Sequence, residues 1–305
     1  DKLHEELTRS FIDKKISILS RGLKQDIILE TEITEDNKVL IDNQFIGELK
    51  GLKFLIEFTS NNLDSDLKSI KKAARKGIEK ELYKRVEKII EDKKIYLEED
   101  SKIYWNKNPI ARIKKGINYW SPGIEIIADD SLSKQSKEDL DNFLKKWLSN
   151  HINNELGDLI NLTKSKINNK YLRALVFQIF ENNGVMKREE VDHIIKLIEK
   201  DDRKEIWKMG IKIGRYHIYL PKMLKPKAVK LRISLWKLFY ENNAKNQIPT
   251  FGLNFLVSEN YNKKFLLLCG FENFKNYFIR VDILEKLFLN ILEKTSNNRF
   301  KITAE

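Results

Sequence analysis

Two stretches of the chain share one apolar pattern, and this repeat restricts the possible folds more than any other feature. The stretches are "NKVLIDNQFIGELKGLKF" (37–54) and "SKIYWNKNPIARIKKGINY" (101–119). Each has two β-rich runs around a short polar turn, which is the pattern of a β-hairpin. The apolar residues Val39, Leu40, Ile41, Ile46 and Leu49 correspond to Ile103, Tyr104, Trp105, Ile110 and Ile113. The sequence therefore predicts two similar hairpins.

An amphipathic helix is predicted after each hairpin, over residues 66–90 and 136–160. At a constant offset of 70 residues, apolar side chains occupy every fourth position of both segments. This spacing places them along one helical face. We therefore predict two tandem strand-strand-helix units, 26–97 and 98–165, which favours duplication of a small domain.

The remaining sequence predicts three further parts. Apolar residues on one helical face indicate a connector helix within 1–25. A helical basic domain is predicted over 166–245, with one of its helices at 186–200. Strand-like runs such as "FLLLCGF" and a final helical pattern predict a small C-terminal α/β unit over 246–305. The expected fold class is α+β and mostly helical: tandem strand-strand-helix repeats, then a helical domain, then the small α/β unit.

Composition indicates a soluble protein, and the sequence shows no recognisable catalytic, metal or cofactor motif. Cys269 is the sole cysteine, so no intramolecular disulfide can form, and a cytoplasmic location is expected. The four histidines lack zinc-ligand spacing, and no apolar run reaches the roughly 18 residues of a membrane helix. Because the chain has no phosphate-binding glycine loop and no clustered carboxylates, we predict no catalytic residue, no metal site and no cofactor within it. The start at Asp1 without a methionine leads us to expect a truncated piece of a longer polypeptide.

Basic charge is concentrated in one segment. The net charge is +12, yet residues 203–240 contain eleven Lys or Arg and only one acid, Glu205. A lysine-rich composition alone can reflect an AT-rich genome, so the distribution carries more weight than the total. The excess in this segment favours a nucleic-acid partner.

A row of lysines repeats along the helix predicted over 66–90. Lys68, Lys72, Lys76, Lys80, Lys84 and Lys88 recur every fourth residue and face away from the apolar stripe. One interpretation is an ordinary solvated face, with nearby glutamates relieving the repulsion. The other is a ridge that follows a phosphate backbone, with Lys68, Lys72 and Lys76 among its contacts.

The segment "IGRYHIYLPKMLKP" (213–226) predicts a strand that turns into a helix. Apolar residues alternate with a slip at Gly214, where a bulge is plausible, and Pro226 suits the first position of a helix. The predicted nucleic-acid contacts at this corner are Arg215, His217, Tyr219, Lys222, Lys225, Lys227 and Lys230. Bases stack on aromatic faces while phosphates pair with cations, which is what a single-stranded site needs. Ordinary packing of the tyrosines and the histidine is the alternative interpretation.

The order of segments resembles a known family. Residues 3–19, 42–54, 105–113 and above all "MGIKIGRYHIYLPKMLKPKAVKLRISLW" (209–236) are similar to the region after the motor in alphaproteobacterial superfamily II helicases, which resemble the RNA helicases of mitochondrial degradosomes. The resemblance implies a non-catalytic accessory region that braces upstream RecA-like motor domains and guides single-stranded RNA or DNA. ATP and Mg are implied only for that motor. Lysine often replaces the arginine common in the family, which loses bidentate phosphate geometry.

Two other functions remain open on the sequence. A protein-interaction scaffold would dock a helicase motor or a nuclease partner through the paired repeats. An independent enzyme such as a nuclease is the third possibility, but the chain offers no clustered carboxylates or metal ligands for it.

Overall fold

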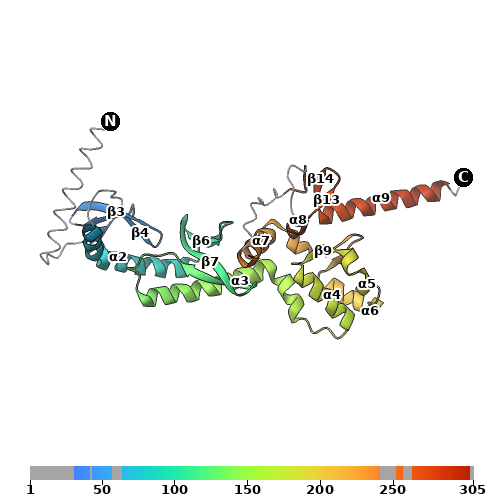
Figure 1. Cartoon of the computed structure of the whole chain (residues 1–305), viewed down its shortest axis with the longest axis horizontal. Coiled ribbons are helices and arrows are strands. Elements are labelled where there is room, and N and C mark those ends of the chain that lie inside the picture. Colours follow the sequence, from blue (N-terminus) through green and yellow to red (C-terminus); the bar gives the residue numbers. More distant parts are fainter. Residues whose placement is uncertain (1–30, 42, 57–63, 241–251, 257–262, 303–305) are drawn as a thin grey trace. The chain divides into compact units, whose positions relative to one another are not determined.

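The computed structural model describes residues 31–41, 43–56, 64–240, 252–256 and 263–302. It is a mixture of helices and small antiparallel sheets, divided into two compact units (Figure 1). Unit 1 comprises Asp1–Lys114 and Gly123–Trp147, and unit 2 comprises Lys115–Pro122 and Leu148–Glu305. The connector helix predicted within 1–25 lies outside the described residues, and the predicted five-part division stays a prediction.

The first sheet of unit 1 is an antiparallel meander of four strands. Its strands are β1 (Thr31–Ile33), β2 (Lys38–Ile41), β3 (Gln44–Lys50) and β4 (Lys53–Ile56), and α2 (Asp64–Asp92) follows them. The hairpin predicted from the sequence is β2 and β3, with an additional strand on either side. The added strands are short and weakly alternating, so the sequence pattern did not reveal them.

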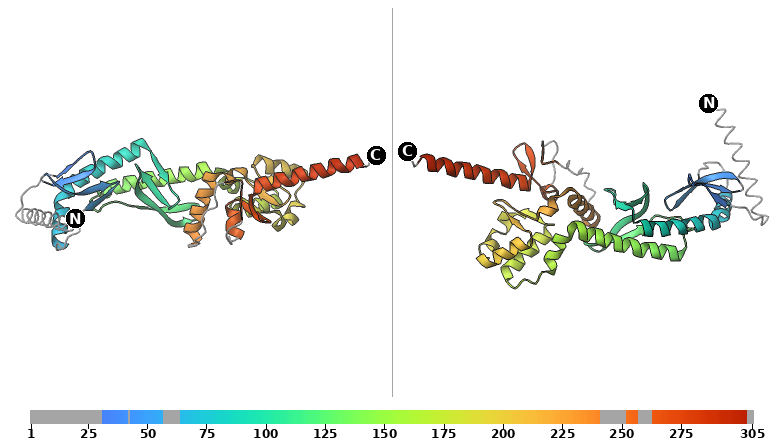
Figure 2. Two further views of the ribbon diagram at one scale, coloured as in Figure 1. Left: turned by 90° about the horizontal axis from the view of Figure 1, so that it is seen from above. Right: turned by 180° about the vertical axis from the view of Figure 1, so that it is seen from behind.

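The sheet is tied to α2 by packing and by one buried cation. Strand β1 packs against α2 (Figure 1, Figure 2). Arg85 of α2 is 7% exposed and donates hydrogen bonds to the carbonyl oxygens of Leu49, at 3.1 Å, and Gly51, at 2.8 Å. Buried carbonyls need such partners, so Arg85 links the end of β3 to the helix.

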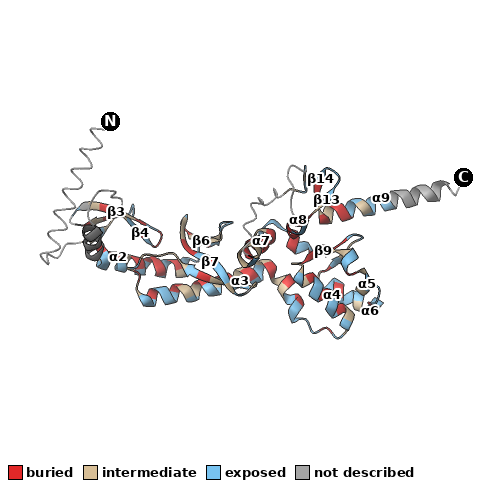
Figure 3. Ribbon diagram, viewed as in Figure 1, coloured by how far each residue is buried: buried red, intermediate tan, exposed pale blue. Residues whose placement is uncertain are grey.

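The second sheet repeats this arrangement. Strands β5 (Ile95–Leu97), β6 (Lys102–Trp105), β7 (Asn108–Asn118) and β8 (Ser121–Ile126) form a second four-stranded sheet, and α3 (Lys134–Lys164) follows it. The predicted second hairpin is β6 and β7. Along α2 and α3, buried residues alternate with exposed ones, as expected of amphipathic helices (Figure 3).

The two sheets agree in local detail. Strand β2 shifts register between Val39 and Leu40, and β6 shifts between Ile103 and Tyr104, which are corresponding positions. The Leu49 N–H donates to the Asn37 carbonyl at 2.8 Å, just as the Ile113 N–H donates to the Ser101 carbonyl at 2.9 Å. Asn37 and Ser101 both have a positive φ, of 64° and 62°. The two meanders therefore share their turn and bulge conformations as well as their order of strands.

Unit 2 contains a three-stranded sheet surrounded by helices. Its elements, in chain order, are α4 (Lys170–Glu181), β9 (Val185–Lys187), η1 (Arg188–Glu190), α5 (Asp192–Ile195), α6 (Lys200–Lys208), β10 (Lys212–Ile213), β11 (His217–Tyr219), η2 (Pro221–Leu224) and α7 (Pro226–Tyr240). The strand order is β10-β11-β9, with antiparallel pairs. The strand-to-helix corner predicted at 213–226 is present, with a short 3-10 turn between β11 and α7.

The single helix predicted over 186–200 is wrong. Met186 is fully buried and pairs with Ile218 in the sheet, so the segment begins as strand β9. The apolar spacing of this segment resembles a helix, but the partner strand lies about thirty residues further along the chain. Tertiary pairing overrides the local pattern here.

The C-terminal segment of unit 2 shares a core with α7. Strands β12 (Asn254–Leu256), β13 (Phe271–Phe274) and β14 (Tyr277–Arg280) form a sheet in the order β12-β14-β13, accompanied by α8 (Lys263–Leu268) and α9 (Val281–Ile302). Val229 and Ile233 of α7 lie in one buried cluster with Phe265, Phe271 and Phe278. The strand expected within "FLLLCGF" is instead mostly the end of helix α8, which ends at Leu268; Gly270, with φ +87°, lies in the turn before β13.

Within the described residues, no helix has the length and apolar character needed to cross a membrane.

Candidate functional site

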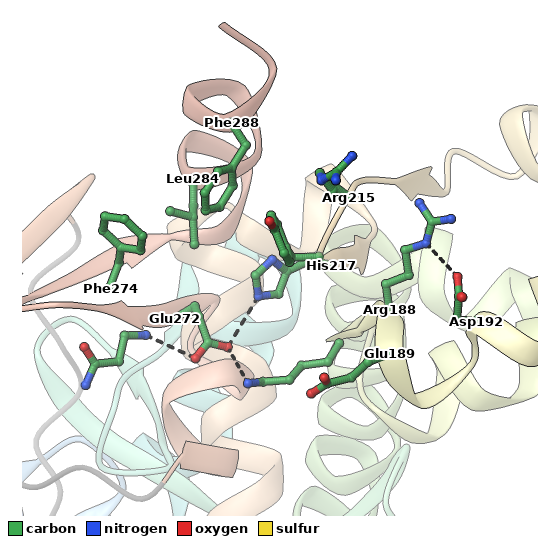
Figure 4. A pocket seen from close by; sticks show the side chains of 12 residues that line it. Arg188, Glu189, Asp192, Arg215, His217, Glu272, Phe274, Leu284 and Phe288 are labelled. Atoms are coloured by element: carbon green, nitrogen blue, oxygen red, sulfur yellow. Dashed lines mark hydrogen bonds and ion pairs between the residues drawn. The ribbon is translucent and has the colours of Figure 1, made fainter. Parts of the chain in front are cut away.

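A cleft of about 740 Å³ lies in unit 2 among β9, η1, the Gly214–His217 segment, β13 and α9 (Figure 4). We call it the α9 cleft. Its walls combine cationic, acidic and aromatic side chains, including Lys187, Arg188, Arg215, Tyr216, Phe274 and Phe288. The predicted strand-to-helix corner therefore contributes Arg215, Tyr216 and His217 to one wall of the cleft.

A buried carboxylate fixes that wall. Glu285 of α9 is 3% exposed and accepts three backbone N–H groups, from Arg215 at 2.6 Å, Tyr216 at 2.9 Å and His217 at 2.8 Å. Hydrogen bonds to a charged acceptor are among the stronger ones in proteins, and a buried carboxylate needs them. The segment that carries Arg215 and Tyr216 is therefore held against α9 by its own backbone.

Gly214 is required by this close approach. A Cβ atom at this position would lie 2.4 Å from the carboxyl group of Glu285, which is closer than real contacts allow. The Gly214 N–H also donates to the carbonyl oxygen of His217 at 2.8 Å, which closes the tight turn before β11. The bulge predicted at Gly214 within one strand is wrong: Gly214 begins a turn between the antiparallel strands β10 and β11, and its missing side chain admits the carboxylate.

The expectation that His217 lies open beside Arg215 and Tyr219 is wrong. Its ring is buried, with Nδ1 3.0 Å from Glu285 Oε1 and Nε2 3.4 Å from Glu272 Oε2. The neighbouring Tyr216 is 48% exposed. The two carboxylates come from elements 55 and 68 residues away, so alternation along the strand could not reveal them. His217 joins the sheet to β13 and α9 and has no open face for a ligand.

Glu272 forms a second bridge at the edge of the cleft. Its carboxylate lies 3.3 Å from Lys187 Nζ and accepts from His217 (Figure 4). Partial burial of Glu272 favours the neutral acid, but the hydrogen bond from His217 and the charge of Lys187 outweigh it and lower the pKa of this carboxyl. Lys187 is therefore engaged within the protein.

The two arginines of the cleft differ in the partners that their guanidinium groups bind. Arg188 donates from Nε to Asp192 at 3.1 Å and from Nη1 to the Gly214 carbonyl at 2.9 Å. Hydrogen bonds from Lys196 and Arg188 lower the pKa of Asp192. Arg215 is exposed, its guanidinium lies 6.0 Å from the centre of the Tyr216 ring, and it forms no ion pair with any described residue. Arg215 is consequently the cation best placed to meet a ligand anion.

Three aromatic rings lie together in the cleft. Tyr216 and Phe288 have ring centroids 4.5 Å apart, and Phe274 meets Phe288 edge to face at 5.9 Å. Tyr216 and Phe274 are 48% and 41% exposed. Half-exposed rings beside a guanidinium provide both a stacking surface and a charge.

The other residues predicted at the corner do not line this cleft. Lys222 pairs with Asp158 of α3 at 2.8 Å and lines a second cleft of about 550 Å³. Lys225 and Lys227 are exposed, and Lys230 is half-buried. Tyr219 is also half-buried, and burial raises its pKa. The predicted set therefore divides between two clefts and the open start of α7, and its nucleic-acid role stays a prediction.

One basic residue of the 203–240 segment lies in the core. Arg232 is fully buried and donates to the carbonyl oxygens of Asn183, at 2.7 Å, and Met223, at 2.5 Å. Burial lowers the pKa of its guanidinium to about 10. These carbonyls end α4 and η2, so Arg232 ties two helix ends to α7, and its charge is not available at the surface.

The predicted lysine row is only partly described. Lys76 is exposed, as are Lys80, Lys84 and Lys88 further along α2. The side chains of Lys68 and Lys72 lie outside the described residues. The row faces solvent where it is described, as both interpretations of the sequence require.

Sequence reasoning missed several residues of the α9 cleft. The sequence pattern predicts Arg188 within a helix and places Phe274 and Phe288 in a separate unit, and no local pattern indicates a role for Glu285. Only proximity in the fold joins them to Tyr216. Among the described residues, no group of three or more His, Cys, Asp or Glu side chains could hold a metal ion.

Comparison of the chain with protein-family models, curated proteins and solved structures finds no match.

Proposed function

We propose that this chain is the non-catalytic accessory region of an ATP-dependent superfamily II helicase, in which it braces the motor and contacts single-stranded RNA or DNA in the cytoplasm. The observation that carries the proposal is the α9 cleft, which is lined by the half-exposed rings of Tyr216 and Phe274 and by Arg215, whose guanidinium has no ion pair among the described residues. Aromatic rings and nearby cations are the common means of binding unpaired nucleotides. ATP and Mg would belong to motor domains elsewhere in the polypeptide.

The distribution of charge supports the same function. Residues 203–240 hold eleven basic residues against one acid, and Lys225 and Lys227 at the start of α7 are exposed. A positive surface attracts phosphates and releases counterions when a strand binds. The exposed lysines would then hold the backbone of a strand near the cleft, without reading its sequence.

We also infer that 31–92 and 95–164 are two copies of one sheet-helix unit, which refines the tandem repeat predicted from the sequence. The inference rests on the matching register shifts, positive-φ turn residues and cross-strand hydrogen bonds of the two meanders. In a helicase, a duplicated unit of this kind would provide the brace for the motor.

The proposal is tested by binding of the 305-residue chain to a fluorescently labelled 12-nucleotide RNA across a range of salt concentrations. We expect micromolar or tighter binding at low salt, weakening as salt rises, because phosphate contacts release counterions. Replacing Lys225, Lys227 and Lys230 together by Ala should weaken binding and flatten the salt dependence. Absence of binding at low salt would refute the proposal.

A protein-interaction scaffold is the second candidate function. Trp207 is 75% exposed, Phe177 57% and Leu197 53%, and large apolar side chains at the surface are typical of docking sites. This function predicts that a motor or nuclease partner co-purifies with the chain after nuclease treatment. Loss of the partner on nuclease treatment would instead indicate a nucleic-acid bridge.

A further inference from the structure

We propose that the α9 cleft binds a single unpaired nucleotide, with its base stacked on Tyr216 and Phe288 and its phosphate on Arg215. This assignment rests on the proposed function, because it specifies how the chain would hold a single strand. It concerns a site of described side chains that no sequence motif revealed.

The stacking surface is rigid before a ligand arrives. The Tyr216 N–H is held by Glu285 at 2.9 Å, and the ring lies 4.5 Å from Phe288 of the same helix α9. One helix therefore fixes both the backbone and the ring of Tyr216. A base that stacks on a fixed ring loses less binding energy to ordering of the protein.

The charges of the cleft suit one phosphate. Lys187 is paired with Glu272, and Arg188 with Asp192, whereas Arg215 has no ion pair among the described residues. Additional phosphates would find Lys187 and Arg188 already engaged by carboxylates and would be repelled by Glu189. The cleft therefore fits one nucleotide of a strand better than a continuous phosphate backbone.

Polar groups at the rim can meet the edge of a base. Glu189, labelled in Figure 4, is exposed and lines the cleft, and so does the exposed Asn273 with its carboxamide. A carboxylate accepts hydrogen bonds from amino groups of a base, and a carboxamide both donates and accepts. A simple inorganic anion would not stack on the aromatic rings, and a purely apolar ligand would offer no anionic group to Arg215.

The experiment compares the wild-type chain with Tyr216→Leu for binding of the labelled 12-nucleotide RNA at low salt, measured by fluorescence anisotropy. Tyr83→Leu is the matched control, since Tyr83 is 51% exposed on α2 and lies outside the cleft. We expect Tyr216→Leu to weaken binding about tenfold, as loss of one base–ring stack does, and Tyr83→Leu to leave it unchanged. Because the Tyr216 side chain is exposed, the variant should fold, which circular dichroism checks.

A second arm identifies the group that is bound. An abasic strand of the same length should bind the wild-type chain and Tyr216→Leu equally, because it offers phosphates without bases. Adenosine monophosphate is then added as a competitor. Full displacement of the RNA would indicate a site for free nucleotide, and no full displacement would indicate a site that needs a strand.

Each outcome decides between the two proposals. Equal RNA affinity of the wild type and Tyr216→Leu would overturn the cleft assignment and leave the proposed function standing. An equal loss of RNA affinity in Tyr216→Leu and Tyr83→Leu would have the same consequence. No RNA binding by the wild type at low salt would overturn both. A selective loss in Tyr216→Leu that is absent with the abasic strand supports both.

Discussion

The α9 cleft and the lysine row of α2 both present cations, yet they are built differently: the cleft balances its cations with acidic side chains, and the row is formed by exposed lysines. In the cleft, the backbone of Arg215 is held by the buried carboxylate of Glu285, the Arg188 side chain donates to the Gly214 carbonyl, and the Tyr216 and Phe288 rings lie in contact. In the row, Lys76 and Lys80 project from an exposed helical face. Both surfaces present cations, so the presence of cations alone does not distinguish them.

The two surfaces should respond differently to substitution of their residues. Residues around the cleft are fixed by long-range hydrogen bonds and steric fit, so substitutions there should affect both stability and binding. Lysines of the row sit on a solvated face, where single substitutions cost little. A surface that is organised before binding is the better candidate for a specific site.

The largest expected effect comes from removing the carboxylate behind the cleft. Glu285→Ala leaves three backbone N–H groups and the His217 ring without their acceptor, so we expect a loss of about 3–5 kcal/mol in the free energy of unfolding. Urea denaturation measures it. Glu79→Ala on the exposed face of α2 is the control and should change stability by less than about 0.5 kcal/mol. Similar values for the two variants would remove the distinction between the surfaces.

A smaller effect is expected from filling the space at Gly214. Gly214→Ala places a methyl group against Glu285 and should cost about 1–3 kcal/mol. Gly157→Ala in α3 is the matched control, because nothing lies within 4 Å of the added carbon, and it should stabilise the helix by about 0.5–1 kcal/mol. In a Glu285→Ala background, the cost of Gly214→Ala should decrease. An unchanged cost in that background would show that the carboxylate is not the cause.

The pH dependence of stability provides a third comparison. The pKa of Glu272 is lowered in the folded protein, so its ionised form contributes stability above the unfolded pKa, and this contribution is lost as the pH falls through the folded pKa. The stability difference between wild type and Glu272→Gln should thus be constant near neutral pH and shrink below 4.5, the ordinary value. Denaturation at several pH values measures it. A difference that grows in acid would contradict the assigned bridge to His217 and Lys187.

The smallest effect is expected in the lysine row. Replacing Lys76, Lys80, Lys84 and Lys88 together by Gln should change stability by less than about 0.5 kcal/mol per site, because the side chains are exposed. Although four charges are removed, RNA affinity should fall less than in the single variant Arg215→Gln. The opposite order would indicate that the row is a phosphate ridge and the cleft is not the main contact.

Local patterns predicted the elements whose partners lie nearby in the sequence. The hairpins β2–β3 and β6–β7 and the helices α2 and α3 follow from alternation and four-residue spacing. The strand-to-helix corner was also predicted. In each case the buried face can be recognised within a single element.

The cleft could not be predicted in this way. Alternation along the strand predicts that His217 is exposed, but its ring is buried in contact with Glu272 and Glu285. Phe288 meets Tyr216 only because α9 folds back onto the Gly214–His217 segment. Such contacts depend on tertiary packing. Gly214 marked an irregular position in the sequence pattern, but that pattern did not indicate that its lack of a side chain admits the carboxylate of Glu285.

Photocrosslinking tests the central claim most directly. A 12-nucleotide RNA carrying 4-thiouridine is irradiated with the 305-residue chain, and the crosslinked peptides are identified by mass spectrometry. We predict crosslinks in the peptides that contain Tyr216 and Phe288, and their loss in Tyr216→Leu. Crosslinks confined to the α2 peptides around Lys76–Lys88, with none in the α9 cleft, would contradict the account.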